Sequence, residues 1–298
     1  AQYLHRELPV RLASAVLELD KASADTGLVN TPSVQRVRED YLLNFRELQA
    51  AEKPSDAKTV AAFTATVKRA QARGCDTVLL VARGLQELMG GGSKPELSAI
   101  CPHLGRVQDF LDNFYQNRVA MRFLSGHYLA LSSPLSPSRG REGIVGLVQR
   151  GVRLSHVAHA AALEAASICS RALGSCPEVR MSVEHAGDVL VAAVPEYVHY
   201  IVLELLKNAM RATMQAHGGG ASAAAAAAAA ANDGFEEDEQ RFGEEGRRRP
   251  DAHVVFANVP EVTIYVRTDG EDDVLLVVSD RGGGIAEENM NKVGGRDR

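Results

Sequence analysis

The first part of the chain has the apolar spacing of amphipathic helices. Leu8, Leu12, Val16 and Leu19 recur every three or four residues, which places them on one helix face. The same periodicity predicts four helices, within residues 7–21, 31–50, 57–89 and 96–131. Helices joined by short loops favour an antiparallel four-helix bundle, which we assign to residues 1–135.

The ends and faces of these helices can also be predicted. Thr31 is placed to cap the second helix, with Pro32 at its first position. A glycine run from Gly90 ends the third helix. Arg118 and Arg122 in the fourth are expected to be solvated or to lie at an interface. The fourth-helix residues expected to face the core are Leu111, Phe114, Val119, Phe123 and Leu124.

A segment rich in Ser, Pro and Gly, Ser132–Gly143, is the predicted linker to a second domain over residues 136–298. Helices are expected near residues 151–174 and from Pro195. Alternating apolar residues predict strands within 178–184, 189–194, 262–268 and 274–280, the last two as a β-hairpin. Helices interspersed with a mostly antiparallel sheet make the chain an α + α/β two-domain protein.

Composition narrows the function classes. The 298 residues are 45% hydrophobic and 24% charged, as in an ordinary globular protein. A net charge of -5 and few aromatic residues disfavour nucleic-acid binding, and no apolar run reaches the ~18 residues of a membrane helix. The chain opens on Ala1 instead of Met and shows no signal or transit peptide, which fits a removed or omitted N-terminal segment. The cysteines form no CxxC pair, so free thiols are expected at Cys75, Cys101, Cys169 and Cys176.

Residues 218–250 form a low-complexity insertion in the second domain. It contains an alanine tract, an acidic block and three consecutive arginines. Such a composition buries little surface. Two interpretations remain open: a surface insertion without a role, and a charged regulatory segment.

The helix that starts at Pro195 carries the first candidate site. Glu204, Asn208 and Arg211 recur at the spacing of one helix face. Any amphipathic surface helix has such a face, but Asn is a poor helix former and suits metal coordination. The residues expected on the opposite, core-facing side are Val198, Ile201, Val202, Leu205 and Ala209.

The second candidate site is the sequence VVSDRGGGI, an apolar strand that ends in Asp280 and three glycines. Glycines here permit positive φ and a close approach of the backbone to a ligand. The Asp280 carboxylate can accept a hydrogen bond from an exocyclic amine such as that of adenine. This pattern is neither a Walker loop nor a dinucleotide-binding loop.

Together the two segments resemble the N-box and G1-box of the GHKL-type ATPase fold shared by histidine kinases and gyrase. In that fold the Asn holds Mg²⁺ against the phosphates and the Asp reads adenine. The match falls on Asn208 for the metal, and on Asp280, Gly282 and Gly284 for the nucleotide.

A closer resemblance covers nearly the whole chain. RELPVRLA, FLDNFYQNRVAMRFLSGHYLAL, ELLKNAMRAT and SDRGGGIA are similar to the mitochondrial 2-oxoacid dehydrogenase kinases, which phosphorylate serine. Leu206 and Arg281 favour the branched-chain subfamily over the pyruvate dehydrogenase kinases, which usually have Phe and Leu at these positions.

The resemblance implies a role for each matched residue. Glu204 would be the general base toward the substrate serine, and His127 of the last bundle helix the histidine that pairs with it. Asn208 would hold Mg²⁺. Arg211 and Lys207 would meet phosphates or form a structural ion pair.

The family also implies ATP, Mg²⁺ and K⁺ as cofactors and the mitochondrial matrix as location. The implied partners are the lipoyl-bearing core and the decarboxylase subunit of a 2-oxoacid dehydrogenase complex, and a second copy of the kinase. The match stops after Val293, before a second glycine box, the potassium site and the C-terminal tail. We therefore expect an incomplete ATPase domain. Two alternatives stay open: an inactive short form that binds the complex, and a histidine kinase.

Overall fold

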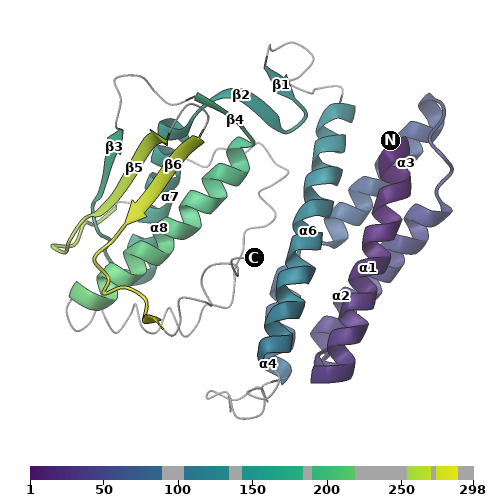
Figure 1. The fold of residues 1–298 in the computed structure, drawn as a ribbon, viewed down its shortest axis with the longest axis horizontal. Coiled ribbons are helices and arrows are strands. Elements are labelled where there is room, and N and C mark those ends of the chain that lie inside the picture. Colours follow the sequence, from purple (N-terminus) through teal and green to yellow (C-terminus); the bar gives the residue numbers. More distant parts are fainter. Residues whose placement is uncertain (89–103, 134–142, 184–189, 219–253, 270–272, 288–298) are drawn as a thin grey trace. The chain divides into compact units, whose positions relative to one another are not determined.

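The computed structural model describes residues 1–88, 104–133, 143–183, 190–218, 254–269 and 273–287 (Figure 1). The chain divides into two compact units. We call Ala1–Leu147 the helical unit and the described residues from Val148 onward the α/β unit. The insertion predicted over residues 218–250 lies outside the described residues apart from its first glycine, and the predicted linker is described only at its ends.

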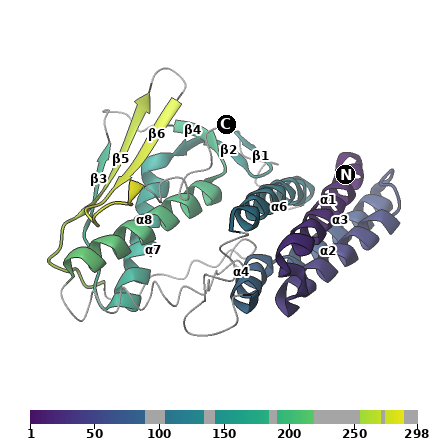
Figure 2. The same ribbon diagram turned by 60° about the horizontal axis from the view of Figure 1, so that its bottom comes forward.

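The helical unit is made of long helices that run side by side (Figures 1 and 2). Its core contains the fully buried side chains of Leu19, Val34, Phe63 and Phe114, so apolar periodicity identified its inner faces. The prediction for Val119 is wrong, because this side chain is 61% exposed. The helices are α1 (Gln2–Thr26), the 3-10 turn η1 (Leu28–Asn30), α2 (Pro32–Ala50), α3 (Ala57–Arg73), α4 (Thr77–Leu88) and α6 (Leu104–Ser132).

The single helix predicted over residues 57–89 is two helices. The chain leaves α3 at Gly74, and a turn follows in which the Thr77 amide donates to the Gly74 carbonyl at 3.4 Å. Glycine lowers helix stability by about 1 kcal/mol relative to alanine, so ending the helix at this position costs little free energy. Periodicity continues across the turn, so it could not show the break. The start of α2 is as predicted, with Thr31 at the cap position and Pro32 first.

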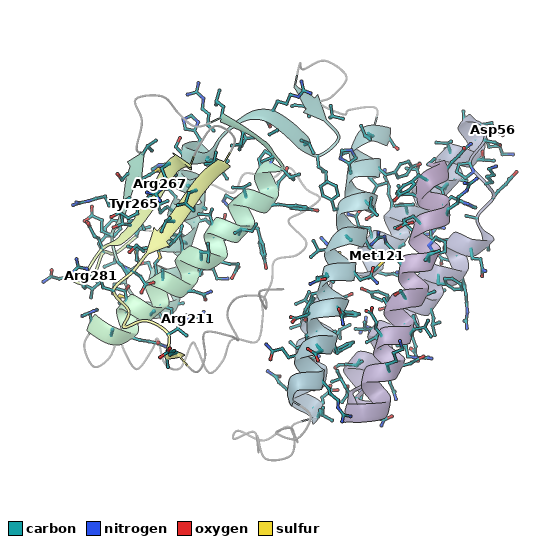
Figure 3. All side chains as sticks on the ribbon, viewed as in Figure 1. Asp56, Met121, Arg211, Tyr265, Arg267 and Arg281 are labelled. Atoms are coloured by element: carbon teal, nitrogen blue, oxygen red, sulfur yellow. The ribbon has the colours of Figure 1, made fainter. Side chains whose placement is uncertain are left out.

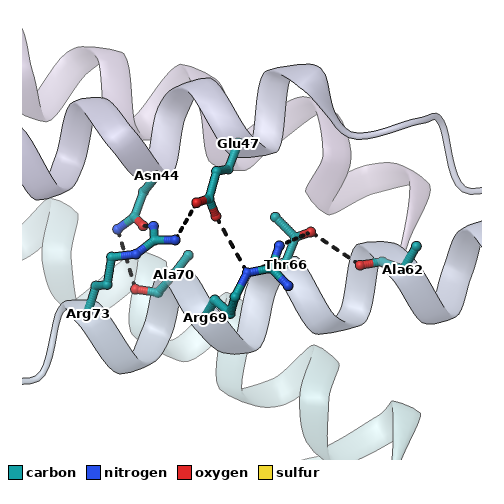
Figure 4. A network of polar contacts seen from close by, with 7 residues as sticks. All are labelled: Asn44, Glu47, Ala62, Thr66, Arg69, Ala70 and Arg73. Atoms are coloured by element: carbon teal, nitrogen blue, oxygen red, sulfur yellow. Dashed lines mark hydrogen bonds and ion pairs between the residues drawn. The ribbon is translucent and has the colours of Figure 1, made fainter.

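A polar network joins α2 to α3 (Figure 4). The Arg73 guanidinium donates to the side-chain oxygen of buried Asn44 and, at 2.5 Å, to Glu47 Oε1. The Arg69 guanidinium lies 3.7 Å from Glu47 Oε2. The Asn44 amide donates to the Ala70 carbonyl at 3.4 Å. The network thereby supplies partners for a polar side chain that α2 buries.

We expect Glu47→Gln to destabilise the helical unit in a pH-dependent way. The hydrogen bond from Arg73 holds the pKa of the Glu47 carboxyl below its usual range. The stabilisation that the ionised Glu47 carboxylate gives the fold is therefore complete above its pKa in the unfolded state, about 4.3. It is lost as the pH falls through the lower pKa of the folded state. Thermal melts at neutral pH should show a lower Tm for the variant, and the gap should close in acid. An equal Tm deficit at every pH would contradict this account.

The α/β unit contains a mixed sheet covered by two helices. Strand β3 (Val179–Val183) pairs in parallel with β5 (Val262–Asp269), and β5 pairs antiparallel with β6 (Asp273–Ser279). The predicted β5–β6 hairpin is thus confirmed, whereas the β3–β5 pair is parallel. The two helices are α7 (Leu154–Leu173) and α8 (Pro195–His217), which pack together on one face of the sheet.

Sequence patterning missed the strands before α7. β1 (Ile144–Val145) and β2 (Val148–Arg153) precede the helix, and β2 pairs antiparallel with β4 (Leu190–Ala193). The helix predicted from residue 151 therefore begins at Leu154. Gly151 has a φ of 70°, which is incompatible with a right-handed helix.

Alternation along β5 separates the core from the outer face of the sheet. Val262, Ile264 and Val266 are buried beneath α7 and α8. Tyr265 and Arg267, labelled in Figure 3, alternate with them and are exposed. This period of two is what the sequence predicted for a half-buried strand. No helix within the described residues is both long and apolar enough to cross a membrane.

Candidate functional site

Helix α8 presents its polar residues beside its buried stripe. Val202, Leu206 and Met210 are buried against α7 and the sheet. Glu204 and Arg211 are half-buried and Asn208 is exposed. The predicted polar face is thus accessible to a ligand.

The predicted core side of this helix is partly wrong. Ile201 is 58% exposed and Leu205 is 45% exposed. They lie three residues before Glu204 and Asn208, and so adjoin the polar face. A helical wheel gives the apolar arc, but packing against α7 and the sheet determines which part of it is covered. The covered part is centred on Leu206 and Met210.

Glu204 has a partner on its own helix. The Lys207 ammonium donates to both carboxylate oxygens, at 2.8 and 3.0 Å. Of the two predicted roles for Lys207, the structure shows the ion pair. The pair holds the Glu204 side chain against the helix at a half-buried position.

Arg211 interacts electrostatically with the buried Cys169 thiol of the α/β unit. Burial, with a smaller contribution from Cys176, raises the pKa of Cys169 to about 12, although the Arg211 charge acts in the opposite direction. Burial also raises the pKa of Cys176 to about 11. The thiols are therefore protonated at neutral pH. Arg211 extends from α8 (Figure 3), and its predicted phosphate contact stays a prediction.

The turn after β6 has the backbone that its glycines predict. Asp280 Oδ1 accepts the Gly282 amide at 2.7 Å, which closes the turn on itself. Gly283 and Gly284 have φ values of 96° and 76°, and a Cβ added at either would meet no atom within 4 Å. The backbone here is open to a ligand.

Gly282 brings this turn onto α8. A Cβ at Gly282 would lie 2.3 Å from the Ala212 Cβ, so only glycine fits this contact. Ala212 follows Asn208 by four residues and therefore lies on the same helix face, about 6 Å along the axis. The structure thus places the Asp280 turn one helical turn from Asn208.

A second tie between these elements was not predicted. The His217 ring Nε2 lies 2.8 Å from the Arg281 carbonyl oxygen. Nothing in the sequence marks His217 or Ala212 for this role. The His217–Arg281 contact joins positions 64 residues apart, and the Ala212–Gly282 contact joins positions 70 residues apart. Only the fold brings α8 and the turn together.

His127 belongs to the helical unit. Its ring stacks on Phe123 with the centroids 5.7 Å apart. The Leu147 amide donates to His127 Nδ1 at 3.3 Å, so the neutral ring carries its proton on Nε2. His127 can therefore donate a hydrogen bond through Nε2. Its pairing with Glu204 stays a prediction.

We expect Gly146→Ala to disturb the His127 ring. Gly146 has a φ of 60°, and a Cβ there would lie 2.5 Å from the ring. The clash and the backbone strain together should cost about 1–3 kcal/mol of unfolding free energy. Thermal melts would measure the loss, and imidazole ¹⁵N shifts would show a changed His127 environment. Gly151→Ala is the matched control, since its φ is 70° with no atom within 4 Å of the added Cβ. Unchanged His127 shifts in Gly146→Ala would contradict the proposed contact.

Of the two alternatives expected for Arg118, solvent exposure is wrong. Arg118 is only 5% exposed, so it is buried within the helical unit. It lines a cavity of about 70 Å³ together with Tyr41, Arg122 and Met121, the last of which Figure 3 labels on α6. An arginine within an apolar period gives no sign in the sequence of its own burial.

The chain is similar to known mitochondrial kinases along almost its whole length. Residues 1–149 match the family described as mitochondrial branched-chain alpha-ketoacid dehydrogenase kinase. The mitochondrial pyruvate dehydrogenase kinase of Arabidopsis thaliana is 30% identical over 295 residues, 98% of this chain and 66% of the relative. Isozyme 1 of the Rattus norvegicus enzyme is 29% identical over 299 residues, 98% of this chain and 58% of the relative. The chain thus spans less than two thirds of the length of these curated relatives.

The chain therefore belongs to a class of proteins in which a helical unit is followed by an α/β unit. In its α/β unit, helix α8 and the β5–β6 hairpin with the turn that follows it form a candidate ligand site. Within that class, the chain belongs to the family of mitochondrial 2-oxoacid dehydrogenase kinases. The family assignment made from the quoted motifs is confirmed.

The site fits the nucleotide and metal that such a kinase uses. Open space beside Gly283 and Gly284 leaves room for a ligand, and Asn208 is an exposed residue with an amide side chain. Among the described residues there is no cluster of three His, Cys, Asp or Glu able to hold a metal. A single amide oxygen such as that of Asn208 suits Mg²⁺, which takes few protein ligands and completes its shell with phosphates and water.

Proposed function

We propose that the protein acts as an ATP-dependent serine kinase of a mitochondrial 2-oxoacid dehydrogenase complex, and that its α/β unit is a GHKL-type ATPase domain. The relatives named above are mitochondrial kinases that bear the name of pyruvate dehydrogenase. The proposed substrate is a serine of the decarboxylase subunit, whose phosphorylation would switch the complex off. The proposed partners are the lipoyl-bearing core and a second copy of the kinase, in the mitochondrial matrix.

One observation carries this proposal: the order of groups along α8. Gly282 contacts α8 at Ala212, Asn208 lies one turn before that contact, and Glu204 lies one turn before Asn208. Successive steps of four residues rise by about 6 Å each on one face. A nucleotide with its base at Asp280 and its phosphates toward Asn208 would present its terminal phosphate to the region of Glu204.

Each residue then has a separate task. Asp280 would accept the adenine amine, with Gly282 and Gly284 letting the backbone approach the ligand. Asn208 would hold Mg²⁺ through its amide oxygen, and Arg211 would meet phosphate charge. Mg²⁺-bound ATP supplies the phosphoryl group when present.

Glu204 would accept the proton of the serine hydroxyl as its oxygen bonds to phosphorus, with ADP as the leaving group. His127, a donor through Nε2, would support that carboxylate. The Lys207 ammonium must share the Glu204 oxygens with the incoming hydroxyl, because it already donates to both.

We prefer the branched-chain complex as substrate. The branched-chain description matches residues 1–149, and the segments that carry Leu206 and Arg281 resemble the branched-chain kinases more than the pyruvate dehydrogenase kinases. The Arabidopsis thaliana and Rattus norvegicus relatives are pyruvate dehydrogenase kinases, which makes the pyruvate complex the competing substrate.

Radiolabelled ATP would test the function. The chain should transfer acid-stable phosphate to the branched-chain decarboxylase subunit faster than to the pyruvate subunit. Faster labelling of the pyruvate subunit would overturn only the substrate preference. Acid-labile phosphate would indicate a histidine kinase. Binding to the complex without labelling would favour the inactive binding-module alternative.

A further inference from the structure

His217 closes the C-terminal end of α8 against the turn that carries Asp280. Its Nε2 lies 2.8 Å from the Arg281 carbonyl oxygen, in the turn where Figure 3 labels Arg281. A carbonyl oxygen only accepts, so Nε2 must carry the hydrogen. The contact is a hydrogen bond donated by the last residue of the helix.

The same peptide group reaches Asp280 on its other side. The Arg281 carbonyl and the Gly282 amide belong to one peptide unit, which is trans. Its two groups point in opposite directions. The carbonyl accepts from His217, and the amide donates to Asp280 Oδ1 at 2.7 Å. One rigid plane thus links the imidazole to the carboxylate, and hydrogen bonds in such a chain strengthen one another.

The turn is also held in position along α8. Gly282 sits against Ala212, five residues before His217. Ala212 provides only a steric stop, whereas His217 provides a directional bond. Rotation of the peptide plane about the Ala212 contact would move the Asp280 oxygens, and the His217 bond opposes that rotation.

We propose that His217 is a positioning residue that sets the Asp280 carboxylate for recognition of an exocyclic amine on the bound purine. The inference rests on the proposed function, because it concerns the same nucleotide site. His217 acts through the turn and does not touch the nucleotide. Its loss should therefore weaken selectivity for adenine more than it weakens nucleotide binding in general.

The test compares Mg²⁺-bound ATP with Mg²⁺-bound inosine triphosphate, which has a carbonyl in place of the adenine amine. Calorimetry on the whole chain would give both affinities. For His217→Ala we expect about a tenfold loss of ATP affinity, or about 1.4 kcal/mol. Inosine triphosphate affinity should stay within about twofold of that of the unchanged protein, because it makes no amine contact with Asp280.

Two variants sharpen the result. His217→Gln keeps a side-chain N–H donor and should recover much of the ATP preference. His159→Ala removes another exposed histidine, on α7, and should change neither affinity. A destabilised helix end would weaken both nucleotides equally, so the ratio of the two affinities separates positioning from folding.

Each outcome is decisive. A reduced ATP preference in His217→Ala, with recovery in His217→Gln, supports the inference. An unchanged ratio in a protein that prefers ATP overturns it and leaves the proposed function standing. If the unchanged chain binds neither nucleotide, the inference fails together with the proposed nucleotide site.

Discussion

An Asn208→Ala variant is expected to lose Mg²⁺-dependent ATP binding. The amide oxygen of Asn208 is the proposed protein ligand of the Mg²⁺ ion. The methyl side chain of alanine has no atom that can coordinate the ion. Loss of a direct ligand should cost about 100-fold or more in affinity for Mg²⁺-bound ATP, roughly 2.7 kcal/mol or more. Asn208 is exposed, so the fold should survive the change. Calorimetry with ATP in the presence and absence of Mg²⁺ measures the effect.

The control for this prediction restores an oxygen ligand. Asn208→Asp keeps an oxygen at nearly the same place and should retain part of the Mg²⁺ dependence. Without Mg²⁺, all three proteins should bind ATP with similar, weak affinity. Equal affinity of Asn208→Ala and the unchanged protein for Mg²⁺-bound ATP would refute the metal role of Asn208.

A Glu204→Gln variant should bind nucleotide and transfer almost no phosphate. Glutamine has the shape of glutamate but accepts a proton poorly, so the proton-transfer step should be lost while nucleotide binding remains. General bases contribute about 10²–10⁴-fold to rates, and a loss of this size is expected in kcat. The measurement pairs phosphorylation of the decarboxylase subunit with ATP affinity in the same preparation.

The Glu204–Lys207 pair supplies a second control. Glu204→Gln also removes the ion pair that Lys207 makes on the helix, at 2.8 Å. Lys207→Met removes the same pair and keeps the carboxylate. If both variants lost activity to the same extent, the ion pair and not the base would be the important feature. Activity retained in Lys207→Met alone would support the base.

Local patterning accounts for most of the fold. The face of each element that meets the core determines its apolar pattern. Examples are the stripe with Leu12 and Leu19 in α1 and the alternation of Ile264 and Tyr265 in β5. The sequence-based predictions fail where contacts with neighbouring elements determine the structure. The turn at Gly74 breaks the helix although the apolar period of the sequence continues across it. Helix α7 and the sheet leave Ile201 exposed although it belongs to an apolar arc.

The candidate site divides in the same way. Asn208 and Asp280 could be predicted because their residue types and spacings belong to a known motif. His217, Ala212 and Leu147 could not, because each acts through one contact that exists only after folding. Their contribution is to orient the recognised residues, and orientation leaves no periodic pattern in the sequence.

Helix α8 and the turn after β6 together form the proposed adenine-nucleotide site. Hydrogen–deuterium exchange of the whole chain, with and without Mg²⁺-bound ATP, tests it most directly. We expect slower exchange on ATP addition over residues 204–217 and 280–285. No change in either segment at saturating ATP, or protection confined to the helical unit, would contradict it.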